Sequence, residues 1–146
     1  MKTEEGITFH RLRAENAGLL EDADVFDNPV DPRQLAAFVA DRGHEMVFAM
    51  AGKTVVGMAS GTVLLHPDKP PAFFIAEVGV NEDMRLRGIA TELVQMLLNV
   101  ARESGYRGIW LATESDNVEA RALYRKLGAR STEAVVVYDW DGAMDG

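Results

Sequence analysis

The chain has 146 residues, of which 47% are hydrophobic and 26% are charged, a composition typical of a soluble globular protein. Its 15 basic and 23 acidic side chains give a net charge of -8, which argues against nucleic acid and anionic membranes as partners and is compatible with cationic ones. The absence of cysteine excludes disulfides, thiolate metal ligands and a cysteine nucleophile. We therefore expect a single domain over residues 1–146.

The N-terminal residues and the apolar runs give no membrane signal. Residues 1–6 lack the apolar core of a signal peptide. The longest apolar run, residues 54–65, is interrupted by glycines and is shorter than a bilayer span. We expect a cytoplasmic protein.

The chain begins with a strand pattern and a helix pattern, followed by an acidic loop. Apolar and polar side chains alternate over residues 7–13 as in a half-buried strand, and helix-forming residues follow at 14–20. Residues 21–31 read as a polar loop that Val25 and Phe26 anchor. The loop carries the acidic residues Glu21, Asp22, Asp24, Asp27 and Asp31.

A capped helix and a hairpin come next. Asp31 is expected to cap a helix with proline at its first position, and Gly43 is expected to end it. Residues 45–51 and 54–65 are rich in strand formers and are joined by a short glycine turn, which predicts an antiparallel hairpin. The three prolines of residues 66–71 predict a rigid loop.

The second half of the chain alternates strands and helices. The sequence predicts strands at residues 72–80 and 109–113, and an amphipathic helix from Ile89 to Ser104-Gly105. Asn117 is expected to cap a further helix that Gly128 ends. A valine-rich strand at 132–140 and a frayed tail at 141–146 complete the chain.

The turn between strand 72–80 and the helix at Ile89 predicts a phosphate site. Gly88 allows a ligand to approach the backbone closely, and the first-turn amides of the helix point outward at the positive end of its dipole. Arg85 and Arg87 add two cations to a chain that is otherwise acidic.

Two motifs in this half of the chain resemble those of the GCN5-related N-acetyltransferase (GNAT) family. The first, Arg-x-x-Gly-x-Ala, is met by Arg85, Gly88 and Ala90. The second, Asn-x-x-Ala-x-x-Leu-Tyr-x-Lys-x-Gly, is met by Asn117, Ala120, Leu123, Tyr124, Lys126 and Gly128. The resemblance covers nearly the whole chain and implies an α/β (α+β) fold with a central mixed, mostly antiparallel sheet of six to seven strands and about four helices.

One feature departs from the family pattern. Members usually end in two strands after the tyrosine helix, whereas the residues beyond Gly128 most easily make one long strand and a stub. We therefore expect a homodimer in which the partner covers the free edge of the sheet.

The resemblance also implies acetyl-CoA as the cosubstrate. The first motif would hold the coenzyme A pyrophosphate, with Asn117 as a further contact. The residues implied at the turn are Arg85, Leu86, Arg87, Gly88, Ile89, Ala90 and Thr91. Backbone groups of Val78 and Val80 would bind the pantetheine arm, and an amide near Val78 would stabilise the thioester oxygen.

Within the family, the sequence is most similar to the small aminoglycoside 3-N-acetyltransferases of the gentamicin type. That similarity rests on residues 24–27 and the helix after them, on an acid before the Val-Gly-Val end of strand 72–80, and on the Ala-Leu-Tyr-x-Lys-Leu-Gly run. It implies a polycationic amine substrate, although an ordinary solvated acidic loop would look the same. The substrate-binding candidates are Asp24, Phe26, Asp27, Glu77, Glu114 and Asp116.

Acetyl transfer to an amine needs a neutral nitrogen, charge stabilisation at the thioester oxygen and a proton for the leaving thiolate. Tyr124 is the candidate acid, because a phenol of pKa about 10 holds its proton at neutral pH and can donate it. Glu77, on an otherwise apolar strand, is the candidate base and a contact for a cationic substrate. Its carboxylate could instead face solvent or pair with an arginine, and the base could be a water or His66.

Other chemistries find little support. His10 and His44 have no partners at metal-ligand spacing, so we expect no metal site. Residues 57–61 miss the spacing of a serine nucleophile elbow.

We expect an acetyl-CoA-dependent N-acetyltransferase that acts by direct attack in a ternary complex on a primary amine of a small polycation. An aminoglycoside antibiotic is the expected substrate, and its acetylation would confer resistance. Two alternatives stay open. They are a protein N-terminal or lysine acetyltransferase and a non-catalytic acyl-CoA-binding sensor.

Overall fold

The computed structural model describes residues 6–145. Residues 1–5, which belong to the segment without a signal-peptide core, and residue 146, the end of the expected tail, lie outside the described residues. The chain forms two compact units, one up to Leu111 and one from Ala112 onward.

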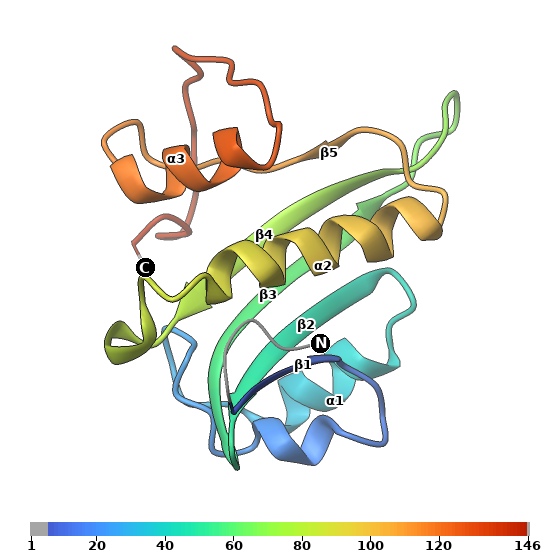
Figure 1. Ribbon diagram of the computed structural model, residues 1–146. Helices are drawn as coiled ribbons and strands as arrows, with labels where there is room; N and C mark the ends of the chain where they lie inside the picture. The colour runs from blue at the N-terminus through green and yellow to red at the C-terminus, as the bar shows by residue number, and fades with distance from the viewer. Residues whose placement is uncertain (1–5, 146) are drawn as a thin grey trace. The chain divides into compact units, whose positions relative to one another are not determined.

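The first unit is built on a mixed, mostly antiparallel sheet, as the sequence predicts (Figure 1). Its strands are β1 (Ile7–Arg11), β2 (His44–Ala51), β3 (Thr54–Leu64), β4 (Ala72–Val80) and β5 (Ile109–Trp110). They lie in chain order, with antiparallel pairing from β1 to β4 and parallel pairing between β4 and β5. The described residues therefore contain five strands rather than the expected six to seven, with the same fold class.

The described residues also contain three α-helices and two short 3-10 helices. The α-helices are α1 (Pro32–Ala40), α2 (Ile89–Glu103) and α3 (Val118–Lys126), and the 3-10 helices are η1 (Ala17–Leu20) and η2 (Glu82–Met84). Only α3 belongs to the second unit. The sequence predicted about four helices, and the first of these is the short η1.

Helices α1 and α2 pack on opposite faces of the sheet. An ideal Cβ at Gly57 of β3 would lie 3.0 Å from Leu93 of α2, so α2 covers the face to which Gly57 belongs. The next residue of β3, Met58, lies on the other face and belongs to a buried cluster on which Leu35 and Phe38 of α1 pack. Figure 1 shows α2 running across β3 and β4.

Two N-terminal expectations need correction. Residues 14–20 contain the four-residue η1 instead of an α-helix, because the side chain of Asn16 bonds the amide of Arg13 and the carbonyl of Arg11 and so folds a turn there. Helix α1 ends at Ala40, before Gly43. Asp41 leaves the helix in an extended conformation, and its carboxylate accepts a 2.7 Å hydrogen bond from the Gly43 amide.

The C-terminal strands were also predicted wrongly. β5 has only two residues instead of the expected 109–113, and residues 132–140 form no strand in the described structure. Val135, Tyr138 and Trp140 are 70%, 79% and 77% exposed. β-branched residues favour a strand only when a neighbouring strand pairs with them, and none does so here within residues 6–145. Residues 141–145 form hydrogen-bonded turns instead of a frayed end.

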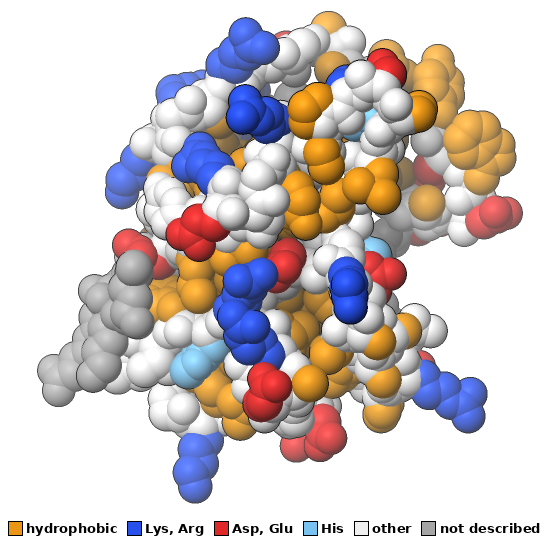
Figure 2. Space-filling model, turned by 90° about the vertical axis from the view of Figure 1, so that its right-hand side faces the viewer, with side chains coloured by type: hydrophobic (Ala, Val, Ile, Leu, Met, Phe, Trp, Pro, Cys, Tyr) orange, Lys and Arg blue, Asp and Glu red, His pale blue; other side chains and the backbone are white. Residues whose placement is uncertain are grey.

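The molecular surface mixes both signs of charge. Figure 2 shows basic, acidic and apolar side chains interspersed on one face. Among the described residues, no helix has both the length and the apolar character needed to cross a membrane.

Candidate active site

The turn before α2 has the backbone shape of an anion cradle. Leu86 and Gly88 both lie in the left-handed region, with φ of 65° and 79°. The left-handed conformation costs a non-glycine residue about 1–3 kcal/mol. Leu86 is 91% exposed, so packing of its side chain does not offset that cost. When residues with left-handed and right-handed backbone conformations alternate, successive backbone N–H groups point toward one place, where an anion can bind. The strained Leu86 therefore supports the predicted phosphate site.

Gly88 occupies the N-cap position of α2 and leaves the first amides of the helix open. It has no side chain to bond them, and an ideal Cβ there would meet no atom of the described chain within 4 Å. Arg85 ties this turn to the end of β4, because its Nε donates a 3.3 Å hydrogen bond to the carbonyl of Val80. Open amides, free space and arginine side chains fit a pyrophosphate.

The strand that leads into this turn has a free edge. β5 pairs with β4 only at Phe73 and Phe74, and no other described strand follows on that side. The register places Val78 and Val80 on the sheet face that α2 covers. Their unpaired backbone edge has the hydrogen-bonding groups that an amide-containing chain such as pantetheine requires.

A bulge in β4 decides where Glu77 points. Ile75 lies opposite Gly61 and Glu77 lies opposite Ser60, so Ala76 is an extra residue in β4. In a regular strand, residues 75 and 77 are two positions apart and share a face, so Glu77 would lie on the same face as buried Ile75. The bulge instead sends Glu77 to the opposite face, the one that carries the α1 cluster.

On that face, Glu77 meets the acidic loop at residues 21–31. The carbonyl oxygen of Val25 would lie 2.8 Å from an ideal Cβ at Gly79, so the loop backbone rests directly on β4. Glu77 is exposed by surface area, yet the surrounding protein desolvates its carboxylate and so raises its pKa. The negative charge of Asp27 raises the pKa of Glu77 further. The structure thus brings two of the predicted site residues, Glu77 and Asp27, close together.

The other acidic-loop residues divide between structural and open positions. Val25 and Phe26 pack against the buried cluster under α1, so the fold already uses part of the Phe26 ring that was predicted to bind substrate. Asp31 caps α1, and its carboxylate accepts hydrogen bonds from two helix amides, at 2.8 and 3.4 Å. Asp24 stays exposed.

Two residues of this site carry no role in the sequence-based interpretation. Ser60 is 3% exposed, lies opposite Glu77 on the same face, and its hydroxyl has no side-chain hydrogen bond within the described residues. Gly79 is the position on which the acidic loop rests. The signals were present, because a lone polar residue in an apolar strand and a glycine inside a strand both indicate a special contact.

The second unit holds the remaining candidates. Asn117 caps α3 by accepting a 3.0 Å hydrogen bond from the amide of Ala120, as predicted. Tyr124 is half-buried, and burial raises the pKa of its hydroxyl, which keeps the group protonated at neutral pH. Glu114 and Asp116 are exposed in the loop before α3. Because β5 ends at Trp110, these two lie beyond the strand end to which the sequence assigned them.

His66 lies at the opposite end of β4 from the turn that precedes α2. It belongs to the proline loop before Ala72, whereas Glu77 lies five positions after Ala72, roughly 17 Å along an extended strand, and is therefore nearer to that turn. This separation favours Glu77 over His66 as the base. Within the described residues no group of three or more histidine, aspartate or glutamate side chains could hold a metal ion.

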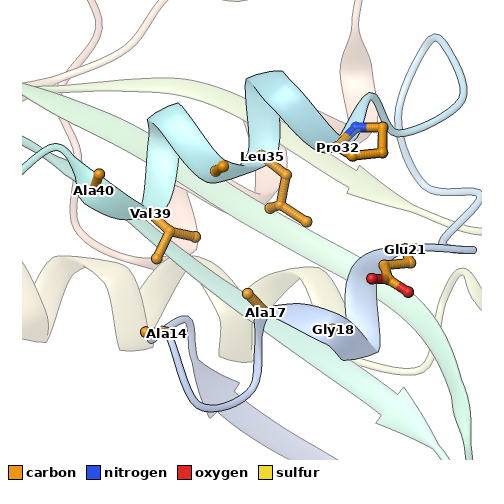
Figure 3. A pocket seen from close by; sticks show the side chains of 9 residues that line it. Ala14, Ala17, Gly18, Glu21, Pro32, Leu35, Val39 and Ala40 are labelled. Atoms are coloured by element: carbon orange, nitrogen blue, oxygen red, sulfur yellow. The ribbon is translucent and has the colours of Figure 1, made fainter.

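A groove between η1 and α1 lies outside these candidates. It has a volume of about 450 Å³, and Leu35 and Val39 of α1 point toward the segment with Ala17 and Glu21 (Figure 3). Glu21 is its one charged lining residue. None of the predicted catalytic or cofactor residues lines this groove, so we assign no chemistry to it.

Comparisons with known proteins identify the family of the chain. The acetyltransferase (GNAT) family matches residues 11–129. N-acetyltransferase 8 of Homo sapiens is 29% identical over 97 residues, which make up 66% of this chain and 43% of that protein. The chain therefore spans less than half the length of this curated relative.

Two solved structures share the fold. An aminoglycoside acetyltransferase, meta-AAC0020 from an uncultured soil metagenomic sample, solved with trehalose, has a TM-score of 0.80 and 17% identity over 95% of this chain and 98% of its own. The aminoglycoside N-acetyltransferase AAC(6')-Iy, solved with CoA, has a TM-score of 0.74 and 19% identity over 92% and 95%. Such low identities show the fold alone. The family match, which spans most of the chain, shows that this protein belongs to the acetyltransferase (GNAT) family, whose members use acetyl-CoA.

Proposed function

We propose that the chain is an acetyl-CoA-dependent N-acetyltransferase that modifies a primary amine of a small polycation by direct attack in a ternary complex. The observation that carries this proposal is the placement of Glu77. A bulge turns its carboxylate out of the core, and the strand that bears it leads directly into the turn before α2 that is predicted to bind phosphate.

The cosubstrate would be held by this chain at two places. The amides and arginines of the turn would bind the pyrophosphate, with Arg85, Leu86, Arg87 and Gly88 followed by Ile89, Ala90 and Thr91 in the first turn of α2. The free edge of β4 at Val78 and Val80 would bind the pantetheine arm, and an amide near Val78 would stabilise the thioester oxygen. Asn117 completes the proposed contacts.

The proposed reaction needs one base and one acid from the protein. Glu77 accepts the proton that the amine loses, directly or through a water, while the nitrogen forms a bond to the acetyl carbon. The carbon–sulfur bond breaks, and Tyr124 gives its proton to the departing thiolate. A raised pKa suits each group, because Glu77 becomes a stronger base and Tyr124 stays protonated until it is needed.

The carboxylates of the first unit support a cationic substrate. Asp24, Asp27 and Glu77 are all exposed side chains, and Asp27 lies close enough to Glu77 to shift its pKa. Glu114 and Asp116 are proposed to bind further ammonium groups. An aminoglycoside, acetylated at its 3-amino group, is the specific substrate that we propose, and both structural neighbours are named aminoglycoside acetyltransferases.

The proposal also includes a homodimer. The apolar side chains of Val135, Val136, Val137, Tyr138 and Trp140 are exposed, and a partner subunit would cover them.

Thiol release from acetyl-CoA tests the function across a panel of aminoglycosides, polyamines, amino acids and peptides with free N-termini or lysines. We expect turnover with the polycationic amines, and mass spectrometry of the product would identify the acetylated position. Turnover with peptides alone would instead make the chain a protein acetyltransferase. Acetyl-CoA binding without turnover on any amine would favour the sensor alternative.

A further inference from the structure

We propose that Gly79 is a positioning residue that sets substrate selectivity. By letting the acidic loop rest on β4, it places Asp27 beside Glu77 and makes the site select amines that carry a second ammonium group near the reacting one. This inference rests on the proposed function and adds to it the residue that determines the substrate class.

Gly79 is needed here for space, since its backbone conformation is open to other residues. Its φ lies outside the left-handed region in which glycine is favoured. An added Cβ would lie 2.8 Å from the carbonyl oxygen of Val25, a distance that real Cβ atoms essentially never show. Because that oxygen belongs to the backbone, a methyl group at position 79 must push the loop away from β4.

The contact at Gly79 differs from those at the other glycines of β3 and β4. A Cβ at Gly57 would meet Leu93 of α2 and the neighbouring strand, and one at Gly61 would meet Phe73 and Phe74 of the neighbouring strand. Only at Gly79, among these strand glycines, is the nearest atom the backbone of a loop far away in the chain. Gly79 therefore links β4 to the acidic loop.

The side chains around this contact hold the loop in one orientation. Ala23, Val25 and Phe26 pack against the buried cluster under α1. Asp24 and Asp27 remain exposed between and beyond these anchors, and the charge of Asp27 acts on Glu77. Asp27 is also the only group whose charge contributes to the pKa shift of Glu77 among the described residues. The loop that contacts β4 at Gly79 is thus the same loop that brings Asp27 close to Glu77.

Two neighbouring carboxylates match a substrate with two neighbouring amines. Asp27 would hold the amine that stays protonated, while Glu77 accepts the proton of the amine that reacts. A nearby ammonium group also lowers the pKa of the reacting amine, so that a larger fraction is neutral and nucleophilic at pH 7. A monoamine would gain neither effect, which is why the arrangement favours di- and polyamines with closely spaced nitrogens.

A double-mutant cycle of Gly79→Ala and Asp27→Asn tests this inference. We expect each single change to raise KM for a closely spaced diamine roughly tenfold to a hundredfold, the loss of one charge-assisted contact, with little change in KM for a matched monoamine. In the Asp27→Asn background, Gly79→Ala should add little further loss, because it acts through Asp27. Additive losses, or equal losses for monoamine and diamine, would overturn the proposal.

A second readout requires no turnover. Carboxyl NMR of the free protein follows the titration of Glu77, and its midpoint should move to lower pH in both variants, because both remove the nearby negative charge. An unchanged titration midpoint of Glu77 in the Gly79→Ala variant would overturn the proposed role of the Gly79 contact, even if no amine proved to be a substrate. Conversely, a shifted midpoint without turnover would support the proposed role of the Gly79 contact while the proposed function failed.

Gly18→Ala is the matched control, since a Cβ at that position would meet no described atom within 4 Å. It should leave both the KM ratio and the titration of Glu77 unchanged. If Gly79→Ala does not fold, Asp27→Asn alone still decides the coupling to Glu77, and the absence of any shift in that variant would refute it.

Discussion

At the scale of single residues, Glu77 and Tyr124 carry the proposed chemistry. Both have a pKa above the ordinary value, and for both the first cause is desolvation. The negative charge of Asp27 raises the pKa of Glu77 further. Ionisable groups held in such unfavourable surroundings are a recurrent mark of catalytic sites, because the fold gains no stability from them.

Replacing Glu77 by Gln should lower activity and raise stability together. Loss of the base should reduce kcat/KM by roughly 10²–10⁴-fold and remove the acidic limb of its pH profile, which should lie above the pH at which an ordinary glutamate titrates. Since folding raises the pKa of Glu77, its protonated form stabilises the fold at low pH, and that stabilisation is lost as pH rises through the folded pKa. The neutral variant should therefore melt higher than the wild type at pH 7 and equally at pH 4.

Glu45→Gln is the control for that experiment. Glu45 forms hydrogen bonds of 3.1 and 2.9 Å with Arg11 across β1 and β2, so its loss should lower the melting temperature and spare activity. A Glu77→Gln variant with wild-type kcat/KM at every pH would remove Glu77 from the mechanism.

Tyr124→Phe should slow the reaction without weakening acetyl-CoA binding. The variant keeps the ring and loses only the proton donor, so kcat should fall by roughly 10²-fold or more while the calorimetric Kd for acetyl-CoA stays the same. Tyr106→Phe is the matched control, because that ring stacks on Phe73 at 5.8 Å and takes no part in the proposed reaction. Equal kcat in the two variants would reject Tyr124 as the acid.

At the scale of elements, the site depends on two local departures from regular structure. One is the left-handed pair Leu86 and Gly88 at the start of α2, and the other is the bulge at Ala76 in β4. Each changes the direction of a polar group relative to a regular helix or strand. The first turns amides outward, and the second turns a carboxylate out of the core.

Gly88→Ala should weaken acetyl-CoA binding. The new methyl group enters the open space before the first amides of α2, and the left-handed φ of 79° costs an alanine about 1–2 kcal/mol. Isothermal titration should show a raised Kd, and thermal melting a small loss of stability. Leu86→Gly relieves the strain at the neighbouring position and should keep the Kd, whereas a large loss there would mean that the leucine side chain itself contacts the ligand.

Inserting one alanine between Ser60 and Gly61 of β3 should damage the fold as well as the site. The inserted residue would pair with Ala76 and give β4 a strict two-residue period, so that either Glu77 enters the face of buried Ile75 or Ile75 leaves it. We expect a broadened or absent thermal transition and no activity. Ala76→Gly keeps the bulge and should melt cooperatively, and an insertion variant that folds and works as well as Ala76→Gly would contradict this role of the bulge.

At the scale of the whole molecule, the net charge of -8 favours the approach of cationic substrates. Salt screens this attraction beyond a Debye length of about 10 Å at 0.1 M. We therefore expect kcat/KM to fall with ionic strength, and more steeply for a substrate with four ammonium groups than for one with two. Equal slopes for substrates of different charge would show that long-range attraction plays no part.

Local signals accounted for much of the fold. The bounds of β4 were predicted correctly, as were the start of α2 and the caps Asp31 and Asn117, because a cap or a strand run is decided by residues that are neighbours in sequence. The strand expected at 132–140 was wrong for the opposite reason. Its valines have the right propensity, but a strand also needs a partner that sequence pattern does not supply.

The sequence by itself determined the family motifs, the proposed phosphate-binding turn and the identity of the candidate acid and base, because each is a short run of residues whose chemistry is local. Only the tertiary structure decided which face Glu77 occupies and which charge lies beside it. The face follows from pairing with β3, where Ala76 becomes an extra residue, and the neighbouring Asp27 arrives because Gly79 leaves room for a distant loop. Both are contacts between segments far apart in the chain, which no local pattern records.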